Sequence, residues 1–301
     1  MATPVPAVER AGRIVALLST GPRRRWTVSQ VSAELGLAKA TCFAILTCLT
    51  ELGWIRRDSS AKSYCLGPEF VRLGWATLEQ VRGLAVARRE MFALARELDV
   101  GCFVCALVDD EMVILDVAGG EDESLALPSL DARPVPARPP LGSVYFAWSS
   151  PDEIDAWLRR SGGARTVREL EVNRRALRAI RARGYSVGGG VEVQLQVEEL
   201  LDRIGTSRGD ERIELAITLA DLVRGTPAGE SPGTVPHPVT HLIAPAFDAA
   251  GRISLTLTVV GRAGQVHDAN VTEYAAPLLA GLGRVTTLIG GRVPDAGLLS
   301  A

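Results

Sequence analysis

The segment Thr27-Val28-Ser29-Gln30-Val31-Ser32-Ala33-Glu34-Leu35-Gly36-Leu37 decides the fold of the first part of the chain. Thr27 is a favourable helix N-cap, and Gln30, three residues later, can complete a capping box. Gly36 suits the left-handed residue that follows many helices. The segment therefore predicts a short helix and a tight turn, after which a second helix runs from about residue 39 to residue 52.

The flanking residues extend this helix pair into a larger pattern. A further helix is predicted before it at residues 7–19, and a short basic hairpin follows it at residues 54–66. Helix, turn, helix and wing in this order can place one helix in the major groove of DNA. The helix at 39–52 should turn one stripe inward, made of Cys42, Ile45, Leu46, Leu49 and Leu52.

The opposite face of that helix is the predicted reading surface. Lys39 can meet a phosphate, and Phe43 and Thr47, one turn apart, can touch base edges. The alternative for Phe43 is packing on the preceding helix, because aromatic residues are more often buried than exposed. The hairpin cations either contact a minor groove or backbone, or form a solvated surface. The predicted DNA-binding residues are Arg23, Arg24, Arg25, Thr27, Lys39, Ala40, Thr41, Phe43, Thr47, Arg56, Arg57 and Lys62.

Charge is unevenly distributed along the 301 residues, although the net charge is only −2. Residues 1–82 contain 11 Lys and Arg against 6 Asp and Glu, a balance of +5, whereas residues 83–301 contain 22 against 29, a balance of −7. A basic segment followed by an acidic one suits a protein that offers one end to phosphate. The length allows two domains, each with its own hydrophobic core.

Targeting and metal signals are weak. No apolar run reaches the length of a membrane span and no signal peptide is evident, so we expect a cytoplasmic protein without a membrane partner. Cys102 and Cys105 have metal-like spacing, but in a strand their sulfurs point to opposite faces and two further ligands are missing. No metal and no cofactor are predicted. The cysteines are interpreted as buried thiols, and they are Cys42, Cys48, Cys65, Cys102 and Cys105.

The remaining chain mixes helical and strand patterns. The pair Gly67-Pro68 begins a connecting helical stretch. Strands are expected at 102–108 and 112–117 around an acidic turn, and at 241–247 and 252–260. A proline-rich loop (121–140), the break Gly188-Gly189-Gly190 and a Pro/Gly/Ser-rich linker (225–238) interrupt the pattern. Helices are predicted at 85–98, 141–148, 152–160, 169–183, 193–204, 208–224 and 268–289.

No catalytic constellation emerges from the sequence. The three histidines are His237, His241 and His267, and no nucleophile turn, phosphate-cradling loop or His-Glu-x-x-His motif is present. His241 is either a ligand-facing donor or a partly exposed histidine at a strand end. A protein that is not an enzyme is the main hypothesis. The second is a metabolite-processing enzyme with an appended DNA-binding head, because catalytic sets are spatial and can be hidden in a sequence.

Several segments resemble, in order, the IclR family of bacterial transcriptional regulators. Residues 27–53 resemble the winged helix-turn-helix of that family, and Tyr64-Cys65-Leu66-Gly67 is similar to its Tyr-x-Leu-Gly signature. Leu141-Gly142 resembles its Leu-Gly-Lys segment, and Arg183-Gly184-Tyr185 the turn after its long helix. Residues 242–248 are similar to its strand Ile-Ala-Ala-Pro-Val-Phe-Asp.

The resemblance implies an α+β fold: a winged helix-turn-helix (1–67), a linker helix (68–82) and a GAF-like α/β effector-binding domain (83–301) with an insertion at about 193–236. It implies a homodimer or homotetramer that binds double-stranded DNA at a near-palindromic operator. It also implies a small-molecule effector, commonly an organic or aromatic acid, and control of a catabolic operon.

The sequence departs from the family pattern at several positions. Ala40-Thr41 and Ala44 replace a usual Ser-Thr and Arg, so one phosphate contact is expected to be lost. Ser143 replaces the Lys of Leu-Gly-Lys, and His241 stands where a Cys is common. These changes allow a regulator with a closed pocket as a third hypothesis. For a carboxylate effector the candidate donors are Arg133, Arg138, Ser143, His241 and Thr258, of which the two arginines could equally be surface charges.

Overall fold

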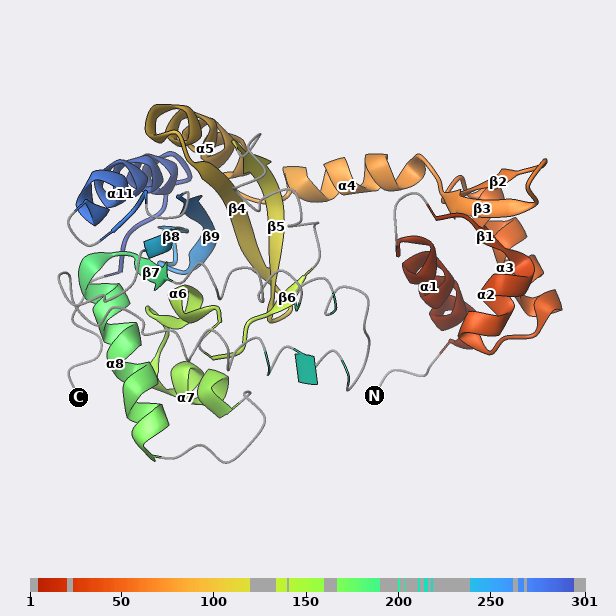
Figure 1. The fold of residues 1–301 in the computed structure, drawn as a ribbon, viewed down its shortest axis with the longest axis horizontal. Coiled ribbons are helices and arrows are strands. Elements are labelled where there is room, and N and C mark those ends of the chain that lie inside the picture. The colour runs from red at the N-terminus through yellow and green to blue at the C-terminus, as the bar shows by residue number, and fades with distance from the viewer. Residues whose placement is uncertain are drawn as a thin grey trace. The chain divides into compact units, whose positions relative to one another are not determined.

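A computed structural model of the chain describes residues 5–20, 24–119, 134–139, 141–159, 167–189, 239–261, 265–267 and 270–294, together with isolated positions between 200 and 218. The chain divides into two compact units, Met1–Gln80 and Val81–Ala301 (Figure 1). Each unit has its own β-sheet, of three strands in the first and six in the second. The α+β fold class is confirmed.

The N-terminal unit is a winged helix-turn-helix followed by a helix. Its three strands form an antiparallel sheet in the order β1-β3-β2. Helices α1, α2 and α3 pack around a core that includes Ile14, Val31, Leu46 and the ring of Trp26. The elements are α1 (Pro6–Leu18), β1 (Trp26–Thr27), α2 (Val28–Leu35), α3 (Lys39–Glu51), β2 (Ile55–Asp58), β3 (Ser63–Leu66) and α4 (Glu69–Glu79).

Local sequence signals set the boundaries of α2. The Thr27 hydroxyl accepts the Gln30 backbone N–H, and the Gln30 side chain accepts the Thr27 N–H, which completes the predicted capping box. Gly36 ends the helix with φ of 64°, a left-handed conformation that glycine adopts without steric cost. The capping and turn predictions are both confirmed.

One part of the predicted inward stripe of α3 is wrong. Cys42, Leu46 and Leu49 are buried, but Leu52 is 57% exposed. Leu52 has already left the helix and forms its C-cap, so the helical spacing no longer directs its side chain to the core.

The C-terminal unit contains a six-stranded sheet in the order β6-β5-β4-β9-β8-β7, with every neighbouring pair antiparallel. Its described elements are α5 (Leu84–Leu98), β4 (Gly101–Val108), β5 (Glu111–Ala118), β6 (Val135–Pro136), α6 (Ser143–Phe146), α7 (Pro151–Arg159), α8 (Val167–Arg183), β7 (Ser186–Gly189), β8 (Val239–Phe247), β9 (Ile253–Val260) and α11 (Val271–Leu288).

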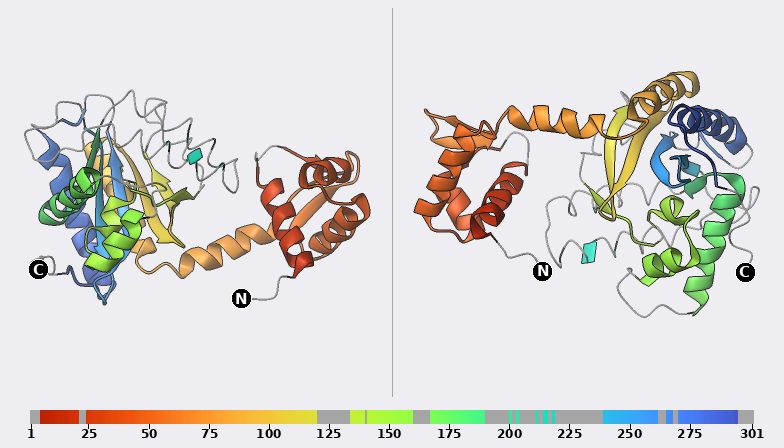
Figure 2. Two further views of the ribbon diagram at one scale, coloured as in Figure 1. Left: turned by 90° about the horizontal axis from the view of Figure 1, so that it is seen from below. Right: turned by 180° about the vertical axis from the view of Figure 1, so that it is seen from behind.

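The strand register separates the two faces of this sheet. On β8, Leu242 and Ala244 alternate with His241 and Ile243, so the two pairs point to opposite faces. Helices α5 and α11 contact each other and the central strands (Figures 1 and 2). Ile243 instead packs with the cluster formed by α6, α7 and α8. We call the face that carries His241 and Ile243 the ligand face.

The structure corrects two further predictions about the second unit. Gly188 and Gly189 do not break the pattern but belong to β7, which pairs with β8. The proline-rich loop contains a two-residue strand, β6, paired with β5 at the sheet edge, where proline is tolerated. The predicted linker at 225–238 and most of the two helices predicted within the insertion lie outside the described residues.

Among the described helices, none alone is long and apolar enough to cross a membrane. The pair α2 and α3, bent by 117°, meets that test together on length and composition.

Candidate functional site

The turn between α2 and α3 is held by one serine. The backbone carbonyl of Ser32 accepts the N–H groups of Gly36 and Leu37, the latter at 3.1 Å. The Ser32 hydroxyl donates to the Leu37 carbonyl at 2.6 Å. These bonds satisfy the backbone of the turn and fix the direction in which α3 leaves α2.

The outward face of α3 is open to solvent. Lys39, Ala40, Phe43 and Thr47 are exposed, and Thr41 is half-buried. Phe43 is 50% exposed, so its side chain is not enclosed by the preceding helix as the alternative interpretation required. The Thr47 hydroxyl donates to the Phe43 carbonyl at 2.9 Å, which commits its proton to the helix and leaves its methyl group for apolar contacts.

The start of α3 can bind an anion. Its N-cap is Ala38, which provides no side-chain hydrogen bond to the first turn. The first N–H groups of a helix have no partner within the helix, and the helix dipole is positive at this end. Lys39 adds a full positive charge at the first helical position. This combination suits a DNA phosphate.

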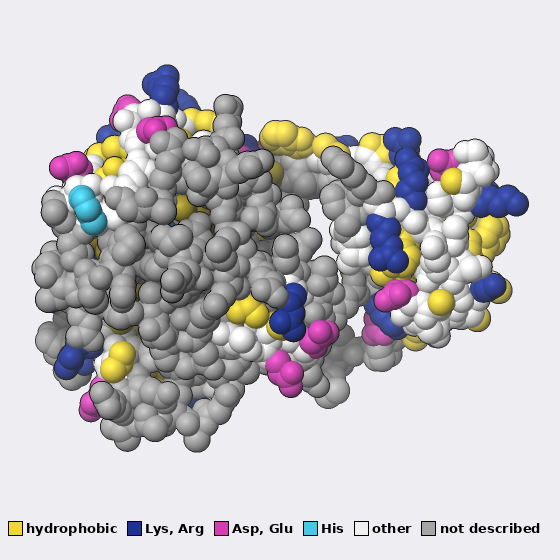
Figure 3. Space-filling view, in the orientation of Figure 1, with side chains coloured by type: hydrophobic (Ala, Val, Ile, Leu, Met, Phe, Trp, Pro, Cys, Tyr) yellow, Lys and Arg dark blue, Asp and Glu magenta, His cyan; other side chains and the backbone are white. Residues whose placement is uncertain are grey.

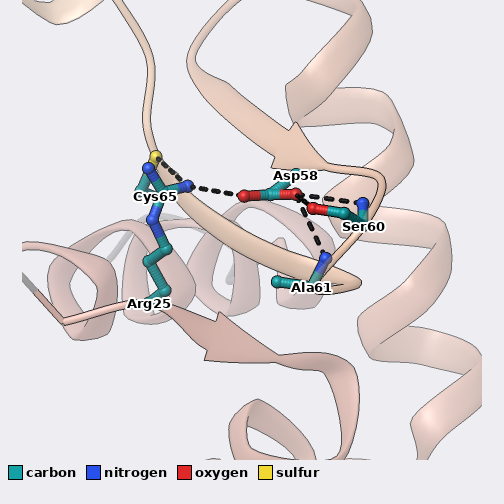
Figure 4. A network of polar contacts seen from close by, with 5 residues as sticks. All are labelled: Arg25, Asp58, Ser60, Ala61 and Cys65. Carbon is teal, nitrogen blue, oxygen red and sulfur yellow. Dashed lines mark hydrogen bonds and ion pairs between the residues drawn. The ribbon is translucent and has the colours of Figure 1, made fainter.

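A carboxylate organises the wing between β2 and β3. Asp58 Oδ1 accepts the Ser60 hydroxyl at 2.6 Å and the N–H groups of Ser60 and Ala61 at 3.0 and 3.1 Å (Figure 4). Arg25 Nη1 lies 3.6 Å from Asp58 Oδ2 and 3.9 Å from Cys65 Sγ. The hydrogen bond from the Ser60 hydroxyl, with those from the backbone, lowers the pKa of Asp58.

The two wing arginines point to opposite sides of β2. Arg56 is opposite Cys65 on β3, and Arg57 is opposite Tyr64, whose ring is buried in the core. Arg56 therefore shares the outer face of the wing with Arg25, which contacts Cys65. Both wing arginines are exposed.

Other predicted cations of the N-terminal unit also lie on its surface. Arg24 places its guanidinium 3.9 Å from the centre of the Trp26 ring, and Lys62 stands at the wing with φ of 48°. Figure 3 shows Lys and Arg side chains at several places on this unit. Arg23 lies outside the described residues.

On the ligand face, His241 and Thr258 lie on neighbouring strands. His241 pairs with Val260 and Thr258 with Ile243, so the two side chains are diagonal neighbours on one face. A Cβ at Gly188 would stand 2.0 Å from the His241 ring, so the imidazole covers this glycine on β7. Burial lowers the pKa of His241 to about 4, and the ring is neutral at pH 7.

The other effector candidates do not gather around His241. Arg138 follows Pro136, which pairs with Glu111 at one end of β5. His241 pairs with Val260 on β9, and Val260 pairs with Gly101 at the opposite end of β4. The seven residue steps along β4 separate these ends by roughly 20 Å. Ser143 begins α6, next to Gly142, whose backbone lies against Ala137 on the Arg138 side. Arg133 lies outside the described residues.

Sequence reasoning missed a buried hydrogen bond on the ligand face. The Tyr145 hydroxyl of α6 lies 2.9 Å from Thr256 Oγ1 on β9, and either oxygen can be the donor. Burial holds the pKa of Tyr145 well above its usual value, so the phenol stays protonated. The bond joins α6 to the middle of the sheet.

The prediction of buried thiols is correct for three of the five cysteines, whereas Cys65 is half-buried and Cys48 is exposed. Cys42, Cys102 and Cys105 are buried, and burial raises the pKa of both Cys102 and Cys105 to about 12. Cys48 is exposed, because it lies on the outward side of α3. Within the described part of the chain, no group of three or more His, Cys, Asp or Glu side chains could hold a metal ion.

A second side chain that sequence reasoning missed is Arg181, in the last turn of α8. It is 9% exposed, and its Nε, Nη1 and Nη2 atoms lie buried without a hydrogen-bond partner among the described residues. Desolvation lowers the pKa of its guanidinium. The sequence offered only its proximity to the buried Ile180 as a signal, within a helix that carries six arginines.

An open reading helix with a basic wing defines the protein as a DNA-binding transcriptional regulator of the winged helix-turn-helix class. Residues 7–59 match the IclR helix-turn-helix domain family. The chain is 30% identical over 190 residues to the glycerol operon regulatory protein of Streptomyces coelicolor, covering 62% of this chain and 74% of that protein. The chain belongs to the IclR family.

Solved structures share the fold at low sequence identity. An IclR transcriptional regulator from Alicyclobacillus acidocaldarius matches with a TM-score of 0.63 at 19% identity, over 96% of this chain and 100% of that one. An IclR homologue from Microbacterium hydrocarbonoxydans, solved in complex with 4-hydroxybenzoate, matches with a TM-score of 0.59 at 16% identity, over 94% and 98% of the two chains.

Proposed function

We propose that this regulator binds a near-palindromic operator as a homodimer or homotetramer and controls a catabolic operon in response to a small organic or aromatic acid. The relative from Streptomyces coelicolor is named as a regulator of the glycerol operon, and the homologue from Microbacterium hydrocarbonoxydans binds 4-hydroxybenzoate. The observation that carries the DNA-binding part is the open face of α3 beside a basic wing.

In this proposal, affinity and sequence preference come from different residues. Lys39, the open start of α3 and the wing arginines neutralise phosphates and release counterions. Phe43 and the Thr47 methyl group contact base edges, where thymine methyls are the natural apolar partners. Arg25 is already paired with Asp58, so its contribution to phosphate binding is smaller than that of Arg56.

Dimerisation through the N-terminal segment is supported by apolar surface on α4. Residues 1–67 would be the DNA-binding domain and residues 68–82 the linker helix, which includes α4. Val71 and Trp75, one turn apart on α4, are both exposed. A second copy of the chain that covers them would hold two reading helices at half-sites about one helical turn apart, or a multiple of it.

The effector would act from residues 83–301. A ligand changes DNA binding only if it binds one arrangement of the two heads better than another. His241 and Thr258 are the candidate contacts that share one patch of the ligand face. The neutral imidazole of His241 can donate to a carboxylate with one nitrogen and accept with the other.

Selection of bound fragments from the source genome by the full-length protein tests the proposal. Enrichment of a near-palindromic site beside a catabolic operon is the expected result, and the operon suggests the acid to assay. Retention of no fragment in dilute buffer, with or without metabolite extracts, would refute it. A thermal-shift screen of organic acids that produces no shift would favour a regulator with a closed pocket.

A further inference from the structure

Arg181 is an unusual side chain for the interior of a protein. A buried guanidinium normally pairs with a carboxylate or with several carbonyl oxygens, because removing its charge from water is unfavourable. Arg181 is 9% exposed, yet none of its three nitrogens has a hydrogen-bond partner in the part of the chain that the structure describes. Among the described residues, the fold therefore holds a desolvated positive charge whose nitrogens have no hydrogen-bond partner.

Another arginine of the same helix provides the comparison. Arg174 precedes Arg181 by seven residues, which is close to two helical turns, so the two side chains leave α8 on the same flank. Arg174 Nη2 donates to Asp155 Oδ1 of α7 at 2.6 Å, and both side chains are about 40% exposed. The more exposed arginine thus has an acidic partner, whereas the buried one has no hydrogen-bond partner within the described ranges.

The surroundings of Arg181 are those of a core position. Leu177 precedes it by one turn and Ile180 is its neighbour, and both are buried against α6 and α7. The chain turns four residues later at Tyr185 and enters β7, whose Gly188 lies under the His241 ring. Arg181 therefore lies in the helix that leads directly into β7, an edge strand of the sheet that carries the ligand face.

We propose that Arg181 is a binding residue for the carboxylate group of a small molecule, which supplies the missing counter-charge. The planar guanidinium presents parallel N–H donors that match the two oxygens of a carboxylate. Burial strengthens such a pair, because water does not compete for the donors. The inference deepens the proposed function. It rests on that function only where it identifies this carboxylate as the effector.

The test uses the full-length protein with acetate, benzoate and 4-hydroxybenzoate as probes, and benzamide as the neutral counterpart of benzoate. Ionic strength is held constant, and binding is measured by thermal shift and calorimetry. The variants are Arg181→Met, which keeps the length and apolar character of the stem, and Arg174→Met, which removes the partnered arginine of the same helix.

Three results are expected. At least one carboxylate binds the wild type, and benzamide does not match benzoate. Arg181→Met loses about tenfold or more in carboxylate affinity, as the loss of charged hydrogen bonds implies, whereas Arg174→Met keeps it. Without a probe, Arg181→Met is at least as thermally stable as the wild type, since it no longer buries an unpaired charge. A purely structural arginine would lower the Tm when replaced.

The opposite results overturn the proposal. The proposal is wrong if none of the carboxylates stabilises the wild type, or if Arg181→Met binds carboxylates as tightly as the wild type. It is also wrong if Arg181→Met changes the oligomeric state, because the counter-charge would then come from a second copy of the chain. DNA binding is followed in the same samples. Carboxylate binding through Arg181 that leaves DNA affinity unchanged would refute only the effector role, and a DNA response retained in Arg181→Met would refute only the role of Arg181.

Discussion

Replacing Arg56 and Arg57 together with alanine should weaken DNA binding on every sequence and flatten its dependence on salt. Both side chains are exposed on β2, and neither contributes to the core of the N-terminal unit. Their proposed partners are phosphates, which carry no sequence information. The loss should therefore be similar on an operator and on unrelated DNA.

The size of the effect follows from counterion release. Each phosphate contact contributes about 0.9 to the slope of log K against log salt. Losing two phosphate contacts in each N-terminal unit of a dimer reduces the magnitude of that slope by about 3.6. When the salt concentration rises from 50 to 200 mM, the factor by which the binding constant falls is therefore about 150 times smaller for the variant than for the wild type.

The register of the wing predicts how the effect divides between the two arginines. Arg56 shares the outer face with Arg25, whereas Arg57 lies on the side of Tyr64 and the core. Arg56→Ala alone should therefore produce at least half of the change. Fluorescence anisotropy at four or more salt concentrations measures the slopes, and the matched control is Arg89→Ala with Arg96→Ala on the exposed surface of α5.

An unchanged slope in the wing variant would remove the wing from the DNA interface. A slope that falls equally in the α5 control would show that net charge, and not the wing, causes the effect. The two variants should keep the thermal stability of the wild type, because all four side chains are exposed.

Three further predictions concern the reading helix, the turn and the ligand face. Phe43→Ala should change sequence preference in a binding-site selection, and an equal loss on all sites would argue against base contact. Gly36→Ala should lower the free energy of unfolding of the N-terminal unit by about 1 kcal/mol in urea titrations, because φ is 64° and only backbone strain is added; Gly36→Asn should cost less. Burial lowers the pKa of His241 to about 4, so the free energy of unfolding should fall by at most about 3 kcal/mol as pH drops from 6.5 towards 4. His241→Gln should lose this pH dependence, and identical pH profiles of the two proteins would contradict the prediction.

Much of the N-terminal unit was predictable because its signals are local. Thr27 and Gln30 form the capping box that their spacing predicts, and Gly36 has the left-handed conformation that its position requires. The acidic turn after β4 also forms where predicted, with Asp109 and Asp110 at positive φ. Such features depend on a few neighbouring residues, so a single sequence contains them.

The errors arise where tertiary context overrides local pattern. Gly188 and Gly189 were interpreted as a break, yet they pair with β8, and the absence of a side chain at Gly188 makes room for the His241 ring. Cys48 and Leu52 were expected to be buried, but Cys48 lies on the outward side of α3 and Leu52 is the exposed residue that follows the helix. Helical spacing alone does not state where a core ends.

The sequence by itself determined the winged helix-turn-helix, the strand pairs and the basic character of the amino-terminal end, because capping, turn chemistry, periodicity and charge act over short distances. Only the tertiary structure decided which candidates meet. It set Arg138 and His241 at opposite ends of the sheet and left Arg181 buried without a hydrogen-bond partner among the residues that the structure describes. Whether an arginine is solvated, paired or unpaired depends on residues far away in the chain, and no local pattern encodes that arrangement.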